Sequence, residues 1–244
     1  MDPFLHCAGC KKILFSVEFE QNLRVCPHCG HHHRMNASQR IAATFDPESF
    51  EELDDDLRSV NILAFPEYQE KLDAAVAKTG LNDGVLSGTA RLGGMRIAVA
   101  VADFAFMGGS MGSVAGEKVA RTLERAADQK EPAVVFCASG GARMQEGLLS
   151  LMQMAKTTAA AVRCSAAGSP FICIFSDPTM AGVLASYASI ADVILSEPKA
   201  LIGFAGARVS KQAQVSRVPD DFQSAEFAYK HGMVDRIVPR REMR

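Results

Sequence analysis

The chain has 244 residues, of which 48% are hydrophobic and 22% are charged, and its formal net charge is −2. This composition is typical of a folded protein of one or two domains and excludes a disordered chain. A near-neutral charge gives no general electrostatic basis for binding nucleic acid or an anionic membrane. The sequence contains no uncharged apolar run long enough to span a bilayer, and its start, MDPFLHCAGC, does not resemble a signal peptide. We therefore expect a cytoplasmic protein, whose thiols stay reduced.

Four cysteines open the chain in two CxxC pairs, Cys7 with Cys10 and Cys26 with Cys29, separated by fifteen residues. Two such pairs place four thiolates around one ion, which is the closed tetrahedral arrangement of structural Zn²⁺. We predict one zinc ion per chain. Because sulfur fills all four positions, no position stays open for a substrate, and the zinc alone does not indicate a function.

The segment between the pairs, KKILFSVEFEQNLRV, is interpreted as a short β-hairpin, because Val17 and Phe19 alternate with polar residues before a turn at Gln21 and Asn22. A unit this small needs the metal for its folding free energy. We assign residues 1–35 to a zinc ribbon and residues 36–244 to a second domain. The histidines at 28 and 31–33 are expected to form a polar exit loop rather than supply ligands.

The second domain begins with a predicted helix at 37–45, preceded by Asn36 and ended by Asp46 and Pro47. The acidic run at 54–56 is expected to be solvated rather than to bind a metal. After Gly80, buried strands are predicted at 96–104, 133–139 and 171–176, with shorter apolar segments starting at Asp192 and Ala200. Helices are predicted at 112–132 and 148–164, followed by a small-residue helix that ends near Ser189. This alternation indicates an α/β protein with a mainly parallel sheet.

Two glycine-containing turns follow predicted strands, at 139–142 and at 179–182. Backbone N–H groups are free where a helix starts, and glycine lets a ligand approach closely. Two such turns that face each other can stabilise an oxyanion, as enolate chemistry requires. The alternative is that both are ordinary tight connections. A phosphate-binding loop is a third possibility, but the GxxxxGK[ST] pattern is missing.

Several motifs together resemble the β subunit of bacterial acetyl-coenzyme A carboxylase carboxyltransferase. They are the ribbon itself, MGGSMGSVAGEK (107–118), ASGGARMQEGLLSLMQMAK (138–156), PTMAGVLASYA (178–188) and ALIGFAGARV (200–209). The resemblance extends from Cys7 to Asp235. It implies a crotonase-like fold of repeated ββα units behind the ribbon.

The resemblance also implies partners and substrates. The family assembles with an α subunit as α2β2 and works with biotin carboxylase and a biotin carboxyl carrier protein. The β side receives acetyl-CoA, the α side receives carboxybiotin, and the product is malonyl-CoA. Nucleic acid and membrane are not expected partners. A carboxyltransferase or decarboxylase for another acyl-CoA, such as propionyl-CoA, and a nucleic-acid-binding regulator are the rival interpretations.

In this chemistry both the thioester enolate and the biotin anion need hydrogen-bond donors more than a side-chain base. We therefore assign the catalytic role to the backbone N–H groups of Gly141, Ala142, Ala181 and Gly182. Gly140 and Arg143 are candidates for contacting the acyl-CoA, although Arg143 could equally brace the turn or meet the α subunit.

Other polar residues are given structural roles. Glu146 is expected to support a helix dipole rather than act as a base, and His231 to lie on the surface. The thiols of Cys137, Cys164 and Cys173 fall in or beside apolar segments and are predicted to be buried.

Three features depart from the usual family pattern. Ala181 stands where relatives carry the first of two glycines, and the N–H geometry is kept only if its φ is negative. Phe106 and the doubled glycine at 108–109 make the segment 103–110 unusual. The basic lead and the C-terminal tail that many members carry are short here, which weakens a nucleic-acid role.

Overall fold

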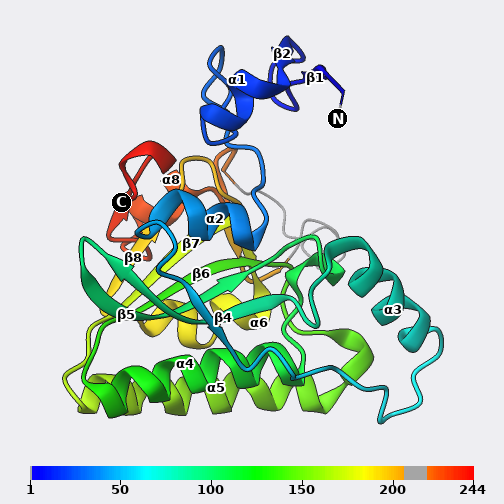
Figure 1. Cartoon of the computed structure of the whole chain (residues 1–244), viewed down its shortest axis with the longest axis vertical. Coiled ribbons are helices and arrows are strands. Elements are labelled where there is room, and N and C mark those ends of the chain that lie inside the picture. Colours follow the sequence, from blue (N-terminus) through cyan, green and yellow to red (C-terminus); the bar gives the residue numbers. More distant parts are fainter. Residues whose placement is uncertain (1, 206–218) are drawn as a thin grey trace.

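A computed structural model describes residues 2–205 and 219–244. One mixed sheet forms its centre, with α4 and α5 under one face and α2 and the N-terminal ribbon above the other (Figure 1). The strands of this sheet are β3 (Glu51–Leu53), β4 (Val85–Leu92), β5 (Met95–Ala102), β6 (Ala133–Ser139), β7 (Phe171–Met180), β8 (Val193–Ser196), β9 (Ile202–Gly203) and β10 (Arg236–Ile237).

The order across the sheet is β10-β8-β7-β6-β5-β4-β3, and β9 pairs with the end of β7. Pairing is antiparallel from β3 through β4 to β5, and parallel from β5 through β6, β7 and β8 to β10. The expected α/β class and mainly parallel pairing are therefore confirmed. Because β6 and β7 run in parallel, the turns that follow them lie at the same edge of the sheet.

The longer helices are α2 (Ala37–Thr44), α3 (Tyr68–Thr79), α4 (Ser113–Gln129) and α5 (Leu148–Ala166), with the short α6 (Ala181–Leu184) and α8 (Ala225–Lys230) after β7 and near the end. The small-residue helix expected through Ser189 is two short pieces, α6 and a 3-10 turn at Tyr187–Ile190. Sequence patterns missed α3 and β4. Within the described residues, no helix is both long and apolar enough to cross a membrane.

Alternation along β5 builds two cores, one on each face of the sheet. Ile97, Val99 and Val101 pack toward α2, whereas Ala98 and Ala100 face α4 and α5. All five side chains are almost fully buried. The period of two puts the large residues on one face and the small ones on the other. The alanines allow the long helices to approach the sheet closely.

The ribbon differs from its prediction. The structure pairs β1 (Phe4–His6) with β2 (Ile13–Phe15), and the next residues form helix α1 (Ser16–Gln21). The predicted hairpin at 11–25 is therefore wrong. Over so short a segment the spacing of Ser16 and Phe19, both buried, also fits one face of a helix. Phe19 packs with Leu14, Cys7 and Cys26 in a small core of its own.

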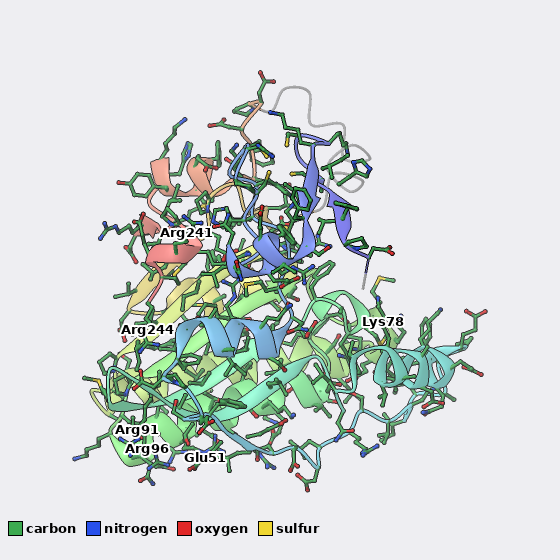
Figure 2. All side chains as sticks on the ribbon, turned by 45° about the horizontal axis from the view of Figure 1, so that its top comes forward. Glu51, Lys78, Arg91, Arg96, Arg241 and Arg244 are labelled. Atoms are coloured by element: carbon green, nitrogen blue, oxygen red, sulfur yellow. The ribbon has the colours of Figure 1, made fainter. Side chains whose placement is uncertain are left out.

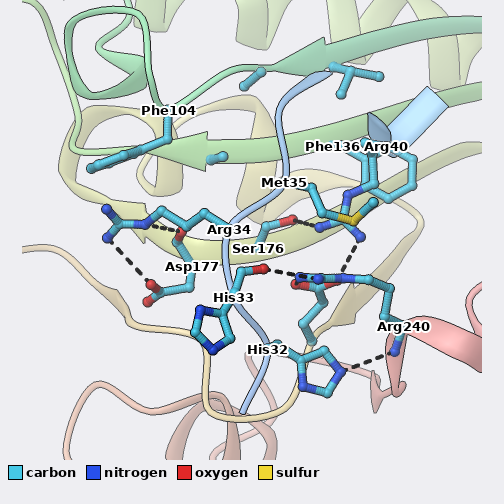
Figure 3. A pocket seen from close by; sticks show the side chains of 14 residues that line it. His32, His33, Arg34, Met35, Arg40, Phe104, Phe136, Ser176, Asp177 and Arg240 are labelled. Atoms are coloured by element: carbon cyan, nitrogen blue, oxygen red, sulfur yellow. Dashed lines mark hydrogen bonds and ion pairs between the residues drawn. The ribbon is translucent and has the colours of Figure 1, made fainter. Parts of the chain in front are cut away.

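A buried carboxylate joins the ribbon to the rest of the chain. Glu197, which follows β8, accepts a hydrogen bond from Arg40 at 2.6 Å and two from Arg240 at 2.6 and 2.7 Å. Arg240 also donates to the carbonyl oxygens of Leu23 and His33. Figure 3 shows Arg40 and Arg240 converging from α2 and from the C-terminal segment. Arg240 is thus one of the side chains that tie the ribbon to the body, together with Arg34, which binds Asp177.

We predict that this carboxylate makes stability depend on acid pH. Burial alone would raise the pKa of Glu197, but Arg240 and Arg40 lower it to about 2 from an ordinary value of 4.5. Because the folded pKa is lower, the stabilisation is present above about pH 4.5 and is lost as the pH falls toward 2. A shift of this size corresponds to about 3 kcal/mol.

Urea unfolding of the wild type and of Glu197→Gln between pH 6 and pH 2 measures this contribution. Both proteins carry the same ribbon, so the difference between the two isolates Glu197. The difference in unfolding free energy is expected to shrink as the pH falls. A difference that stays constant across the range contradicts the assignment.

Candidate functional site: two facing turns, a lysine-lined groove and a four-thiol cluster

The two glycine-containing turns face each other at the ends of β6 and β7. A Cβ built on Gly141 would lie 2.6 Å from the Cβ of Ala181 and 3.5 Å from the backbone nitrogen of Gly182. A Cβ built on Gly182 would lie 3.5 Å from the nitrogen of Ala142. The four residues assigned from the sequence therefore form one cluster. Two of them follow β6 and two follow β7, its parallel neighbour.

The N–H groups of the first turn are not equivalent. Gly140 donates to the carbonyl oxygen of Gly108 at 2.9 Å, and Gly141 donates to Ser139 Oγ at 3.0 Å. The N–H of Ala142 has no hydrogen-bond partner among the described residues. Ala142 is also only partly buried. In this turn Ala142 is the available donor, whereas Gly140 and Gly141 are already satisfied within the fold.

In the second turn, Gly182 is the second residue of α6, so its N–H has no carbonyl one turn earlier in the helix to bond. Gly182 is buried, and a Cβ there would lie 3.2 Å from Met154 Sδ. Ala181 has φ of +49°, which is the left-handed region. The condition of a negative φ is not met, and an alanine held there costs about 1–2 kcal/mol.

Arg143 does not reach the surface, contrary to its assignment as a possible contact of acyl-CoA. Its side chain is fully buried and forms two hydrogen bonds with Asp83, at 2.9 and 3.0 Å. Burial alone would lower the pKa of Arg143, but the Asp83 carboxylate raises it above its ordinary value. The bracing alternative is the one that the geometry supports.

Glu146 supports the start of a helix, as expected, and this helix is α4. Its Oε2 accepts from the N–H of Ser113, the first residue of α4, at 2.6 Å, and its Oε1 accepts from Tyr68 Oη at 2.7 Å. Glu146 is 2% exposed, so it is poorly placed to act as a base on a bound substrate. Its carboxylate instead stabilises the positive end of α4.

The unusual segment 103–110 connects α3 to the first turn. Phe106 is fully buried against Tyr68, Leu72 and Ala75 of α3. At Gly109 the loop approaches β6 so closely that a Cβ would lie 1.8 Å from the carbonyl oxygen of Ala138. Only glycine fits there, which explains the second glycine of the pair.

A groove of about 460 Å³ leads to Ala142 between α3 and the first turn. Its lining residues are Lys71, Ala74, Ala75, Lys78, Met107, Ser110, Ala142, Met144 and Gln145. Figure 2 shows Lys78 on α3, on the far side of the molecule from Arg91 and Arg96. The sequence patterns did not predict this groove, because they did not predict α3. The amphipathic run YQEKLDAAVAKT, ended by Gly80 with φ of +73°, was the available signal.

The four N-terminal thiols lie close enough to share one metal ion. Their sulfur atoms are all within 4.8 Å of one another, and Cys7 lies 3.7 Å from Cys29 while Cys10 lies 3.8 Å from Cys26. A tetrahedron with Zn–S bonds of about 2.3 Å has edges of about 3.8 Å. The observed spacing therefore fits a four-thiolate metal site.

The neighbouring histidines and the remaining thiols have other contacts. His32 Nε2 accepts from the N–H of Arg240, and the ring of His33 packs edge-on against Phe19. The three thiols predicted to be buried are in the main core: Cys137, Cys164 and Cys173. His231 is exposed and stacks on Phe227, as expected for a surface residue.

Comparison with known proteins identifies the family. The carboxyl transferase domain profile matches residues 31–239. The acetyl-coenzyme A carboxylase carboxyl transferase subunit beta of Pelobacter propionicus is 50% identical over 99% of this chain and 86% of its own length. The subunit of the same name from Desulforamulus reducens is 48% identical over 99% of this chain and 84% of its own length.

Solved structures agree with this assignment. A transcarboxylase 12S structure with methylmalonyl-coenzyme A bound superposes with a TM-score of 0.73 at 28% identity, over 86% of this chain but 40% of that chain. The MdcD–MdcE heterodimer of a Pseudomonas malonate decarboxylase gives a TM-score of 0.66 at 26% identity, over 84% of this chain and 79% of that chain. The crotonase-like fold is thus confirmed, and the chain belongs to the carboxyl transferase family, among the β subunits of acetyl-coenzyme A carboxylase.

Proposed function

We propose that this chain is the β subunit of an acetyl-CoA carboxylase carboxyltransferase, which moves the carboxyl group of carboxybiotin to acetyl-CoA and gives malonyl-CoA. The observation that carries the proposal is the 50% identity to a β subunit of that name across almost the whole chain. The facing turns at Ala142 and Gly182 fit the same chemistry, because an enolate needs donors fixed in advance.

In this mechanism the carboxybiotin of the carrier protein releases CO2 and becomes the biotin anion. This anion accepts a proton from the acetyl methyl group. The resulting thioester enolate attacks CO2. Ala142 donates its free N–H to the thioester oxygen as negative charge develops there. Gly182 lies opposite and is the second proposed donor. Gly141 and Ala181 shape the cluster, and Gly141 keeps its own N–H on Ser139.

The groove beside Ala142 is the proposed acetyl-CoA site. Ala142 at its end presents a donor where the thioester would lie, and Lys71 and Lys78 on α3 offer positive charge to the phosphates of CoA. Lys71 already pairs with Glu67 at 3.0 Å, at the exposed surface where such a pair is weak and easily exchanged. Gly140 is exposed near this turn, whereas Arg143 is unavailable for contact.

The metal of the ribbon is proposed to be zinc, held by Cys7, Cys10, Cys26 and Cys29 in a structural role. With four thiolates its shell is closed, so the ion contributes folding free energy to a segment with a very small core. The separation of the chain into a ribbon at 1–35 and a carboxyltransferase domain at 36–244 belongs to the same proposal.

The partner of this chain is proposed to be a carboxyltransferase α subunit, in an α2β2 assembly served by biotin carboxylase and the carrier protein. Large apolar side chains are exposed beside the turns, on the first half of α5 and on the loop next to it: Met144, Leu148, Leu151, Met152, Ile62 and Leu63. Leu63 lies against Gly147 at the start of α5, so the loop and the helix form one surface. An apolar surface of this kind is typical of an obligate interface.

Zinc content tests the metal assignment. We expect about one zinc per chain in the purified protein, by elemental analysis, and almost none in the double variant Cys26→Ser/Cys29→Ser. Cys164→Ser is the matched control, because it removes a buried thiol of the main core and should leave the zinc content unchanged. A folded, active sample without zinc contradicts the assignment.

Substitutions in the second turn test the oxyanion site. Gly182→Ala keeps the N–H but places a Cβ 3.2 Å from Met154 Sδ, which must give by a few tenths of an ångström, and in contact with the Cβ of Ala142 at 3.4 Å, so that it intrudes between the two turns where the substrate must approach. Misplacing one donor should lower kcat by up to about 10²-fold with little change in KM. Ala181→Gly removes the left-handed alanine and should raise the unfolding free energy by up to about 1 kcal/mol without loss of activity.

Malonyl-CoA formation by the reconstituted complex gives kcat and KM, and thermal unfolding gives stability. Wild-type kcat in Gly182→Ala, with the variant folded and bound to the α subunit, would mean that this turn is only a connection. Comparing acetyl-, propionyl- and butyryl-CoA in the same assay distinguishes the acetyl enzyme from one that acts on another acyl-CoA.

Dependence on the partner is tested at the apolar surface. We expect the isolated chain to be nearly inactive, and Leu148→Glu/Met152→Glu to weaken co-purification with the α subunit. Val162→Glu is the control, since it adds the same charge to an exposed apolar position farther along α5. Full activity of the chain alone with carboxybiotin carrier protein, or equal loss of binding in both variants, contradicts this part.

A further inference from the structure

Directly after Ala142, a group of buried polar side chains fills the space between three elements. Arg143, which is fully buried, binds both carboxylate oxygens of Asp83. Its Nη1 also donates to Tyr68 Oη at 3.3 Å, and Tyr68 donates to Glu146 at 2.7 Å. Ser59 Oγ lies 2.7 Å from Asp83 Oδ2 and 3.2 Å from Glu146 Oε1, so its single proton is shared between the two carboxylates. We call Arg143, Asp83, Tyr68 and Glu146 the Arg143 cluster.

The cluster links the proposed donor to the walls of the groove. Tyr68 is the first residue of α3, the helix that carries Lys71 and Lys78. Asp83 precedes β4, and Glu146 binds the start of α4 through the N–H of Ser113. Hydrogen bonds therefore connect the first residue of α3 to Arg143, the residue next to Ala142.

The N–H of Ala142, which has no hydrogen-bond partner in the part of the chain that the structure describes, lies between two backbone groups that are fixed. The carbonyl oxygen of Gly141 accepts from the N–H of Met111 at 2.8 Å, and the N–H of Arg143 donates to the carbonyl oxygen of Met111 at 3.0 Å. The side chain of Arg143, the next residue, is held in place as well, because its guanidinium donates to the carbonyl oxygen of Ser110. The N–H of Ala142 is thus aimed by its neighbours.

Stability alone is a poor explanation for such a group. Buried ion pairs can often be replaced by apolar side chains at no loss, because desolvation offsets their attraction. A buried guanidinium paired with both oxygens of a carboxylate can instead fix the orientation of the segment that carries it. Burial also raises the pKa of Tyr68 to about 12, so the phenol remains a proton donor to Glu146 at neutral pH.

We infer that the Arg143 cluster consists of positioning residues, which fix the direction of the Ala142 N–H and set it in register with the groove wall on α3. The inference rests on the proposed function, because it takes Ala142 as the donor to the thioester oxygen. All four residues are buried, so their effect on the reaction would pass through the backbone at Ala142.

Tyr68→Phe is the test, since it removes one hydroxyl, keeps the ring against Phe106 and leaves the Arg143–Asp83 pair intact. In the complex with the α subunit, we expect kcat to fall by about 10- to 100-fold with KM within about threefold. We also expect amide hydrogen exchange across residues 140–147 to become faster. Ile97→Val is the matched control, because it loses a buried methyl group on β5 with a comparable drop in Tm.

The two readouts separate the inference from the proposed function. Faster exchange together with lower kcat supports both. Faster exchange with wild-type kcat supports the positioning of the turn and overturns Ala142 as the donor. Exchange and kcat that match those of Ile97→Val overturn the inference. If Tyr68→Phe does not fold, Ser59→Ala removes the hydrogen bonds to Asp83 and Glu146 from the partly exposed rim, and the same outcomes apply.

Discussion

The parallel pairing of β6 with β7 is the constraint on which the site depends. Both strands end at the same edge of the sheet, so the turns that follow them must share a small volume. The register shift between Cys137 and Ser139 marks the place where β6 leaves regular pairing and its turn begins. An antiparallel neighbour would have sent one of the turns to the opposite edge. The topology of the sheet alone brings the two turns together, whichever side chains they carry.

Two buried ionic groups hold irregular segments of the chain in place: the first turn and the N-terminal ribbon. Arg143 with Asp83 fixes the first turn to the loop that precedes β4, and Glu197 with Arg40 and Arg240 holds the ribbon against the body. In each, an arginine also donates to backbone carbonyl oxygens of a neighbouring loop. The planar guanidinium serves well here because it can satisfy a carboxylate and a carbonyl at the same time.

Sequence patterns predicted β6 and α5 well, because each is a strongly apolar segment bounded by glycine or proline, whereas α3 and β4 were missed. Strand β6 was predicted at its observed limits, and α5 within two residues of its end. The ribbon helix was mistaken for a strand because six residues are too few to distinguish a period of two from one of 3.6. The four thiols could be found from spacing alone, since ligand spacing is a local property.

The chemistry of the turns could be predicted only in part. Residue types placed Gly141, Ala142 and Gly182 at one site, but the hydrogen-bond partners of each N–H depend on contacts distant in sequence. Ser139 satisfies the N–H of Gly141, one of the four expected donors, and the buried partner of Arg143 lies sixty residues earlier in the chain. No local pattern carries that information.

The contact between positions 141 and 181 has a consequence for how such sequences can change. The Cβ of Ala181 fills the space that any side chain at 141 would need, and Gly141 has φ of +118°. The two positions therefore share room for one small side chain. Position 181 can carry alanine only as long as position 141 stays glycine. The alanine at 181 therefore excludes later substitutions at 141.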